Sequence, residues 1–193
     1  MNEDLSPYDA VALFDLDNSL VDYVGRLRSD FEQLGPSTEP YIHNLFDSSE
    51  EWVQERIRII REKTGWWEWL PRFQLGFDVL DVARKLQFEN HVLTQGPNKI
   101  SSAWSGKKAW CEREVPDCLV TITRQKSLVY GRVLCDDYPN YYRGWLRVRS
   151  RGLVIVPAQP WNADECDDPR IVRYDGDNID EVEERMTQAR NRL

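Results

Sequence analysis

Two aspartates separated by one residue are the most informative feature of this sequence. Asp15 and Asp17 follow the apolar run Val11-Ala-Leu-Phe, which predicts a buried strand of a parallel sheet. Side chains two residues apart on a strand point the same way, so both carboxylates can face one site. Neighbouring carboxylates repel each other, which indicates a divalent cation or a proton between them. The pair also suits an aspartyl nucleophile beside an acid–base partner.

An Asp-x-Asp triplet arises easily in a chain with 33 acidic residues, and solvated turn carboxylates or a helix cap are the alternative interpretation. Three further features favour a functional site. Thr94, Lys126 and the pair Asp136-Asp137 each stand at or just beyond the end of a predicted strand. A parallel sheet brings the carboxyl ends of its strands to one edge, where ligands bind in open α/β sheets.

The spacing of apolar residues predicts five strands and five helices. We expect strands at residues 9–16, 91–94, 119–123, 132–135 and 153–156. We expect helices at residues 20–33, 48–63, 77–90, 99–111 and 179–191. The last helix follows Asn178-Ile-Asp-Glu181, which resembles a capping box. This order is typical of a parallel-sheet α/β domain, with a helical insertion after the first strand.

Length and charge limit the classes of function. A chain of 193 residues with 41% hydrophobic residues predicts one domain, or one domain with a sizeable insertion, around a real core. No apolar run approaches the length of a membrane span, and the start of the sequence lacks the basic region of a signal peptide. The net charge is −8 and no basic block stands out, so long nucleic acid is a poor candidate ligand.

Cysteine and histidine usage argues against a zinc site. The chain has two histidines, and its four cysteines show no C-x-x-C spacing: Cys111, Cys118, Cys135 and Cys166. We expect these cysteines to remain reduced thiols in a cytoplasmic protein.

The order Asp-x-Asp, Thr, Lys and acidic pair resembles the haloacid dehalogenase (HAD) superfamily of phosphatases. Within that superfamily the chain is most similar to the 5′(3′)-deoxyribonucleotidases, over about residues 9 to 146. The linking motifs also resemble that family: Thr64-Gly-Trp-Trp-Glu-Trp-Leu-Pro, Gly76-Phe-Asp-Val-Leu, Gly106-Lys-Lys-Ala-Trp110, Thr123-Arg-Gln-Lys-Ser and Val133-Leu-Cys-Asp-Asp. The resemblance implies a Rossmann-like parallel-sheet HAD core over residues 1–17 and 76–193, with a small helical cap inserted over residues 18–75.

The resemblance implies a Mg²⁺-dependent phosphatase that hydrolyses nucleoside or deoxynucleoside 5′-monophosphates. Asp15 would be the nucleophile that forms an aspartyl-phosphate. Asp17 would protonate the leaving oxygen and then deprotonate the hydrolytic water. Mg²⁺ would be held by Asp15, the backbone carbonyl of Asp17 and Asp137, with Asp136 in support.

The same resemblance assigns the substrate contacts. Thr94 and Lys126 would hold the phosphoryl oxygens, and Gln95 is a further substrate-binding candidate. Three aromatic residues fall where the family encloses the nucleobase: Tyr23, Trp66 and Trp67. The alternative is that these rings form the core of the helical insertion.

The sequence departs from the family pattern at three positions, which puts substrate choice in doubt. Asn18 stands where Gly is usual, Gln95 where a small or hydroxyl residue is common, and Tyr138 where Arg is frequent. Another small phosphate ester or a nucleic-acid 3′-phosphate is an alternative substrate, although the acidic charge argues against the polymer. A catalytically silent HAD-fold binding protein is the alternative from another class. No membrane partner is expected, and a homodimer fits the resemblance.

Overall fold

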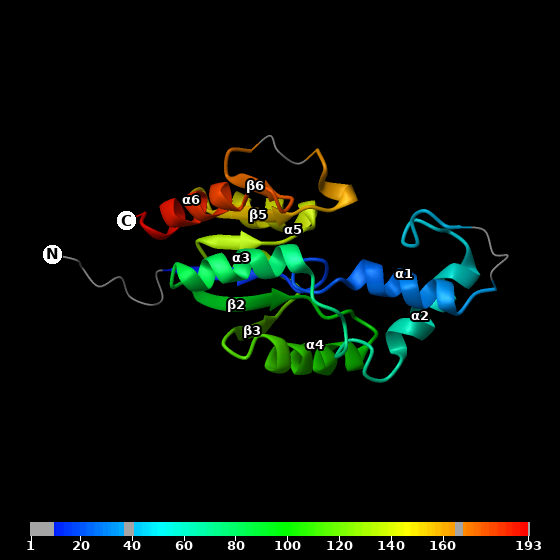
Figure 1. The fold of residues 1–193 in the computed structure, drawn as a ribbon. Coiled ribbons are helices and arrows are strands. Elements are labelled where there is room, and N and C mark those ends of the chain that lie inside the picture. Colours follow the sequence, from blue (N-terminus) through cyan, green and yellow to red (C-terminus); the bar gives the residue numbers. More distant parts are fainter. Residues whose placement is uncertain (1–9, 37–40, 165–167, 193) are drawn as a thin grey trace.

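Six parallel strands form one sheet in the computed structural model, which describes residues 10–36, 41–164 and 168–192 (Figure 1). The strands are β1 (Val11–Phe14), β2 (Glu89–Thr94), β3 (Leu119–Ile122), β4 (Val133–Cys135), β5 (Leu153–Pro157) and β6 (Ile171–Tyr174). Their order across the sheet is β3-β2-β1-β4-β5-β6. The direction of winding reverses between β1 and β4, which makes the carboxyl ends of these two strands the topological switch point. The predicted Rossmann-like α/β fold is confirmed.

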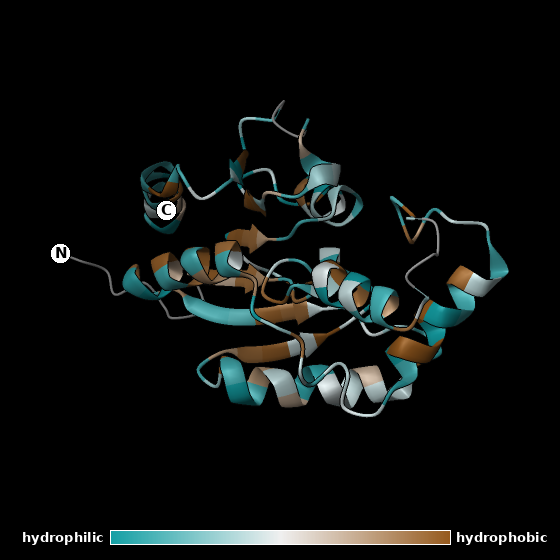
Figure 2. Ribbon diagram, turned by 45° about the vertical axis from the view of Figure 1, so that its right-hand side comes forward, coloured by the Kyte–Doolittle hydropathy of each residue, from teal (hydrophilic) through white to brown (hydrophobic). Residues whose placement is uncertain are grey.

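The described residues form six α-helices: α1 (Tyr23–Gln33), α2 (Glu51–Glu62), α3 (Gln74–Lys85), α4 (Ser101–Glu114), α5 (Pro139–Arg147) and α6 (Ile179–Arg190). Alternate residues of β1 pack in two different hydrophobic clusters, one on each face of the sheet. Ala12 and Phe14 pack in the cluster that α3, α4 and α6 complete, whereas Val11 and Leu13 pack with α5. In Figure 2 brown hydrophobic colour runs along much of the strands, and the helices around them carry teal hydrophilic stretches. A sheet buried on both faces explains the continuous apolar runs of its central strands.

The helices α1 and α2 extend away from the sheet between β1 and α3 (Figure 1). Their buried residues recur with helical spacing and pack in one cluster: Tyr23, Leu27 and Phe31 of α1, with Val53, Ile57 and Ile60 of α2. This pair of helices corresponds to the insertion expected after the first strand. The division into a core of residues 1–17 and 76–193 and a cap of residues 18–75 stays a prediction.

Two elements differ from the sequence expectation. Helix α5 was not predicted, although Tyr142, Trp145 and Leu146 are buried at helical spacing, because Gly144 interrupts the pattern. Strand β6 was also missed, since Arg173 divides its apolar residues and only Val172 and Tyr174 are buried. The capping box expected before α6 is incomplete. Asn178 makes no capping bond to the backbone, and its side-chain amide donates to Glu181 instead.

Three cysteines lie in the described residues as free, buried thiols, as predicted. Burial raises the pKa of Cys111 to about 12 and that of Cys118 to about 11, which makes both thiols poor nucleophiles. Cys166 lies outside the described residues. Among the helices of the described part of the chain, none has the length and apolar character needed to cross a membrane.

Candidate active site

The two acidic motifs meet at the switch point of the sheet. Asp15 directly follows β1 and donates its backbone N–H to the carbonyl of Cys135, the last residue of β4, over 2.8 Å. This bond sets the chain after β1 beside the chain after β4. As a result, carboxylate oxygens of Asp15, Asp136 and Asp137 all lie within 4.8 Å of one another, and all three residues are buried.

A buried lysine from the segment after the edge strand β3 contacts this carboxylate cluster. The Nζ of Lys126 lies 2.8 Å from Oδ1 of Asp15 and 2.7 Å from Oδ2 of Asp136. Lys126 begins a short 3₁₀ helix, η2 (Lys126–Leu128), after β3. Its side chain is 2% exposed, so these carboxylates are its ion partners in place of water.

Asp17 has a different partner, which sequence reasoning missed. The Nζ of Lys107 donates to Oδ2 of Asp17 over 2.6 Å, to the hydroxyl of Thr94 over 3.0 Å and to the carbonyl of Gln95 over 2.7 Å. The Lys107 side chain is fully buried on α4. Its signal in the sequence is its place in the apolar stripe formed by Ala103, Lys107, Trp110 and Cys111.

A tight turn after β1 fixes the direction of Asp17. The carbonyl of Leu16 accepts from the backbone N–H groups of Ser19, Leu20 and Val21. Asn18 has a φ of 56°, in the left-handed region that Gly, and less readily Asn, adopts. Its Oδ1 accepts from the N–H of Val24 over 2.9 Å, near the start of α1. Asn18 therefore adopts the left-handed conformation that Gly adopts most readily.

Residues after β5 hold Asp137 in place. Its Oδ2 accepts from the indole N–H of Trp161 over 3.0 Å, and its backbone carbonyl accepts from the amide of Asn162 over 3.1 Å. Asn162 is fully buried and also donates to the carbonyl of Pro157 over 3.0 Å. Neither Trp161 nor Asn162 was predicted, because the sequence gives no sign that this loop returns to β4.

The pKa shifts of the clustered carboxyl groups indicate an excess of buried negative charge. Burial raises the pKa of Asp136 to about 6, despite the opposing effect of Lys126. Burial and the neighbouring carboxylate of Asp136 raise the pKa of Asp137 well above its usual range. Burial alone would lower the pKa of Lys126, but the carboxylates of Asp136 and Asp15 raise it above its ordinary value. A cation would relieve this excess of buried negative charge.

The residues present fit a hard divalent cation. Asp15, Asp136 and Asp137 offer carboxylate oxygens alone, the ligand type that Mg²⁺ prefers. The Oδ1 of Asp17 is buried without a hydrogen-bond partner among the described residues, so the turn also holds an unsatisfied oxygen. The side chain of Asp17 lies outside the three-carboxylate cluster, and its backbone carbonyl remains the ligand predicted for it.

The predicted nucleobase residues form a compact aromatic group within residues 18–75. The rings of Tyr23 and Trp67 stack 5.5 Å apart, and Trp66 packs edge-on against both. Trp66 and Trp67 are 3% and 2% exposed. The ring of Trp67 faces the Nζ of Lys107 at 5.2 Å, which connects this group to Asp17. In this conformation the rings belong to the core, and their contact with substrate stays a prediction.

The other predicted substrate residues lie around the same edge of the sheet. Thr94 is fully buried at the end of β2 and accepts from Lys107. The Gln95 side chain bonds the hydroxyl of Tyr141 over 3.1 Å. Tyr141 in turn places its ring 4.7 Å from the Nζ of Lys126. Tyr138 is 44% exposed at the start of α5.

Structural comparison identifies the fold. The chain is similar to a protein described as a haloacid dehalogenase-like hydrolase from Burkholderia xenovorans, with a TM-score of 0.52 and 15% identity over 96% of this chain and 99% of that one. It is also similar to the HAD hydrolase YfnB from Bacillus subtilis bound to magnesium, with a TM-score of 0.52 and 10% identity over 92% of this chain and 98% of that one. No protein-family model and no curated protein matches the sequence. The fold is therefore that of HAD-like hydrolases, as the order of motifs predicts, and the resemblance to deoxyribonucleotidases stays a prediction.

Proposed function

We propose that this protein is a Mg²⁺-dependent phosphatase that hydrolyses nucleoside or deoxynucleoside 5′-monophosphates through an aspartyl-phosphate. The observation that carries the proposal is the contact of Lys126 with both Asp15 and Asp136 at the switch point of the sheet. A lysine held there offsets the negative charge of the Asp15 carboxylate as a phosphate approaches. An anionic carboxylate beside a fixed cation is the arrangement that a nucleophile for phosphate esters requires.

The first half of the reaction uses Asp15 and Asp17. A carboxylate oxygen of Asp15 bonds to phosphorus while the bond from phosphorus to the ester oxygen breaks. Asp17 gives its proton to that leaving oxygen, which departs as an alcohol. Burial raises the pKa of Asp17 above its usual value, although Lys107 opposes the rise, and a raised pKa favours the protonated form that this step needs.

The second half returns both groups to their starting state. Asp17, now anionic, takes a proton from a water molecule, and the water oxygen attacks phosphorus. The bond between phosphorus and Asp15 breaks, which releases inorganic phosphate. Thr94 and Lys126 supply donors to the phosphoryl oxygens. Asp15, Asp137 and the Asp17 carbonyl, with Asp136 in support, would hold Mg²⁺, which would supply positive charge to offset the phosphate and carboxylate charges.

The nucleotide part of the proposal rests on the aromatic group formed by Tyr23, Trp66 and Trp67. Base stacking on such rings contributes roughly 1–3 kcal/mol per base. The burial of Trp66 and Trp67 favours a second candidate, a phosphatase for another small phosphate ester that does not use these rings.

A substrate panel tests both candidates. Phosphate release would be measured from dUMP, dTMP, dCMP, dAMP, dGMP and their ribonucleotide counterparts, beside sugar phosphates and p-nitrophenyl phosphate. A clear preference for nucleotides in kcat/KM supports the first candidate. Comparable or better hydrolysis of the simple esters supports the second, and no hydrolysis of any ester contradicts both.

A further inference from the structure

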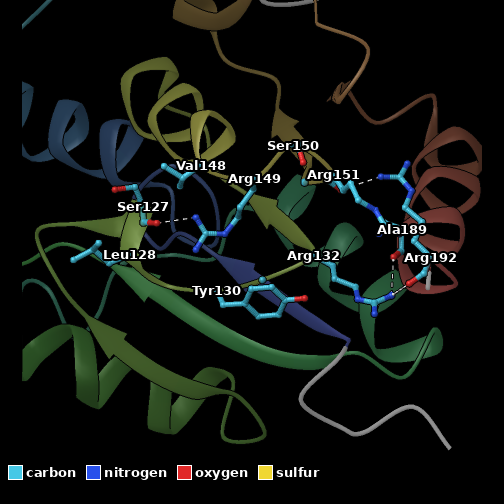
Figure 3. A pocket seen from close by; sticks show the side chains of 12 residues that line it. Ser127, Leu128, Tyr130, Arg132, Val148, Arg149, Ser150, Arg151, Ala189 and Arg192 are labelled. Carbon is cyan, nitrogen blue, oxygen red and sulfur yellow. Dashed lines mark hydrogen bonds between the residues drawn. The ribbon is translucent and has the colours of Figure 1, made fainter. Parts of the chain in front are cut away.

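A second feature lies at the segments that lead into β4 and β5, beside the end of α6. Here a cleft of about 550 Å³ is lined by four arginines: Arg132, Arg149, Arg151 and Arg192 (Figure 3). No aspartate or glutamate occurs among the described residues that line it. The whole chain has a net charge of −8, so four arginines that line one cleft are unexpected from its composition.

Backbone carbonyls hold three of these arginines and leave their charge in place. Arg192 donates from Nη1 to the carbonyl of Arg151 over 2.9 Å. Arg132 donates from Nη1 to the carbonyls of Arg190 and Arg192, over 2.7 and 2.6 Å, at the end of α6. Arg149 donates to the carbonyls of Ser127 and Val129. A neutral carbonyl fixes a guanidinium without cancelling its charge, unlike a carboxylate.

One donor in this cleft remains unused. The Nε of Arg149 is buried and has no hydrogen-bond partner among the described residues. Buried polar atoms are nearly always bonded, so an unpaired one calls for a specific cause. Because this atom is buried, a ligand atom in the cleft would satisfy it only if the Arg149 side chain turned toward the cleft.

The cleft also carries apolar surface. Leu128, Tyr130 and Val148 line it and are 80%, 55% and 65% exposed. In Figure 3 the ring of Tyr130 lies between the side chains of Arg149 and Arg132. Guanidinium groups beside an exposed aromatic ring suit a ligand that joins an anionic part to a flat, apolar part.

We infer that this cleft is a binding site for a small phosphorylated molecule with an aromatic group, that is, a nucleotide distinct from any substrate at Asp15. The planar guanidinium of an arginine can donate two parallel N–H bonds to two oxygens of one phosphate. The volume falls within the range of small-molecule sites, about 300–1,000 Å³. The phosphates would lie among the arginines, and the base would stack on Tyr130.

The cleft contacts the segment that positions Lys126. Ser127 and Leu128 line it, and both follow Lys126 in η2. Arg149 bonds the carbonyls on either side of Leu128. A phosphate that drew Arg149 toward itself would loosen these bonds and with them the position of Lys126. A change in turnover on occupancy rests on the proposed function, whereas binding itself does not.

Calorimetric titration tests the binding site. ATP and inorganic tripolyphosphate would be titrated into the full chain in the presence of EDTA, so that metal-dependent turnover does not consume them. The double variant Arg151→Gln/Arg192→Gln should weaken ATP binding about 10- to 100-fold, since hydrogen bonds to charged groups are lost. The control Arg58→Gln removes an exposed arginine of α2 and should leave the affinity unchanged. Failure of the wild type to bind ATP, or equal binding by the double variant, would overturn the proposal.

The aromatic half has a separate test, which uses a residue too exposed to be needed for folding. Tyr130→Ala should weaken ATP binding about fivefold or more through lost stacking, with the affinity for tripolyphosphate unchanged. Thermal unfolding would verify that the variants keep the wild-type Tm. Equal ATP affinity in Tyr130→Ala would overturn the assignment of a nucleotide. Because the titrations need no turnover, their outcome is independent of whether the protein is a phosphatase.

Discussion

Lys107 donates from its Nζ to Oδ2 of Asp17 over 2.6 Å, although 90 residues separate them in the chain. Lys107 is fully buried, whereas the Asp17 side chain is 31% exposed. The lysine also bonds Thr94 and the carbonyl of Gln95. One buried cation thus connects the proposed acid–base residue to the proposed phosphate-binding residue.

Removing this cation should reduce activity and alter its pH dependence. We expect Lys107→Met to lower kcat/KM about 10- to 100-fold, because Asp17 loses its orientation. Lys107 lowers the pKa of Asp17, so the variant should have a higher Asp17 pKa. Because the first half-reaction needs Asp17 protonated, the fall of kcat/KM with rising pH should move to higher pH.

Lys108→Met is the matched control for that experiment. Lys108 is the next residue on α4, but it is half-exposed and pairs with Glu112. Its variant should keep the wild-type pH profile. A Lys107→Met profile with unchanged shape and position would show that Lys107 serves the fold alone.

Replacing the proposed nucleophile should abolish turnover without unfolding the protein. We expect Asp15→Asn to lose at least about 10³-fold in kcat, since an amide cannot attack phosphorus as an anion. Lys126 keeps Asp136 as a partner in this variant, so the circular dichroism spectrum should be unchanged. Substantial phosphate release by the purified variant, with contaminants excluded, would refute the aspartyl-phosphate mechanism.

Metal removal should have two separate effects. Excess EDTA should abolish phosphate release, and added Mg²⁺ should restore it. Mg²⁺ should also raise the Tm of the protein, because a ligand at 100 times its Kd stabilises the native state by about 2.7 kcal/mol. Asp137→Asn should show a smaller rise in Tm, and sodium chloride at equal ionic strength should produce none. A Tm that does not respond to Mg²⁺ would contradict the assignment of the carboxylate cluster.

Gly76 should be needed for the geometry of the turn after β1. A Cβ on Gly76 would lie 1.6 Å from the backbone carbonyl oxygen of Ser19, so the start of α3 or the turn must move. We expect Gly76→Ala to lower the free energy of unfolding by about 1–3 kcal/mol or more, measured by urea denaturation. In the control Gly144→Ala, a Cβ meets nothing within 4 Å, and the change should stabilise helix α5 by about 0.4–1 kcal/mol. Equal stability of the two variants would show that the contact with Ser19 relaxes at no cost.

Truncating Trp67 distinguishes two possible roles of its ring, contact with the nucleobase and packing in the core. If the ring stacks on the nucleobase, Trp67→Ala should reduce kcat/KM for nucleotides by about 5- to 150-fold. Hydrolysis of p-nitrophenyl phosphate should fall much less. Equal losses on both substrates, together with a lower Tm, would reject the base-pocket assignment and leave the catalytic one intact.

Local patterns in the sequence were sufficient to locate most of the proposed catalytic groups. The apolar runs before Asp15 and Asp136 define strands whose ends carry carboxylates, and the parallel arrangement brings those ends together. The turn residue Asn18 shows how far such reasoning extends. The sequence identifies it as a departure from Gly, but only the structure shows its φ of 56°, a left-handed conformation that Gly adopts readily.

Periodicity fails where one residue breaks a short pattern. Gly144 lies within α5, and Arg173 lies between the two buried residues of β6. Both elements are short, so the remaining apolar residues are too few to predict them. Packing on the sheet overrides the weak local preference.

The sequence by itself determined the order of the strands' acidic ends, the α/β class and the candidate nucleophile, because these depend on residues close together in the chain. Only the tertiary structure decided that Lys107 pairs with Asp17, that Trp161 holds Asp137, and that arginines from three segments share one cleft. Each of these contacts joins residues far apart in the chain. The partner of a buried charge depends on which helix or loop packs over it, and the local spacing of residues in the sequence does not predict that packing.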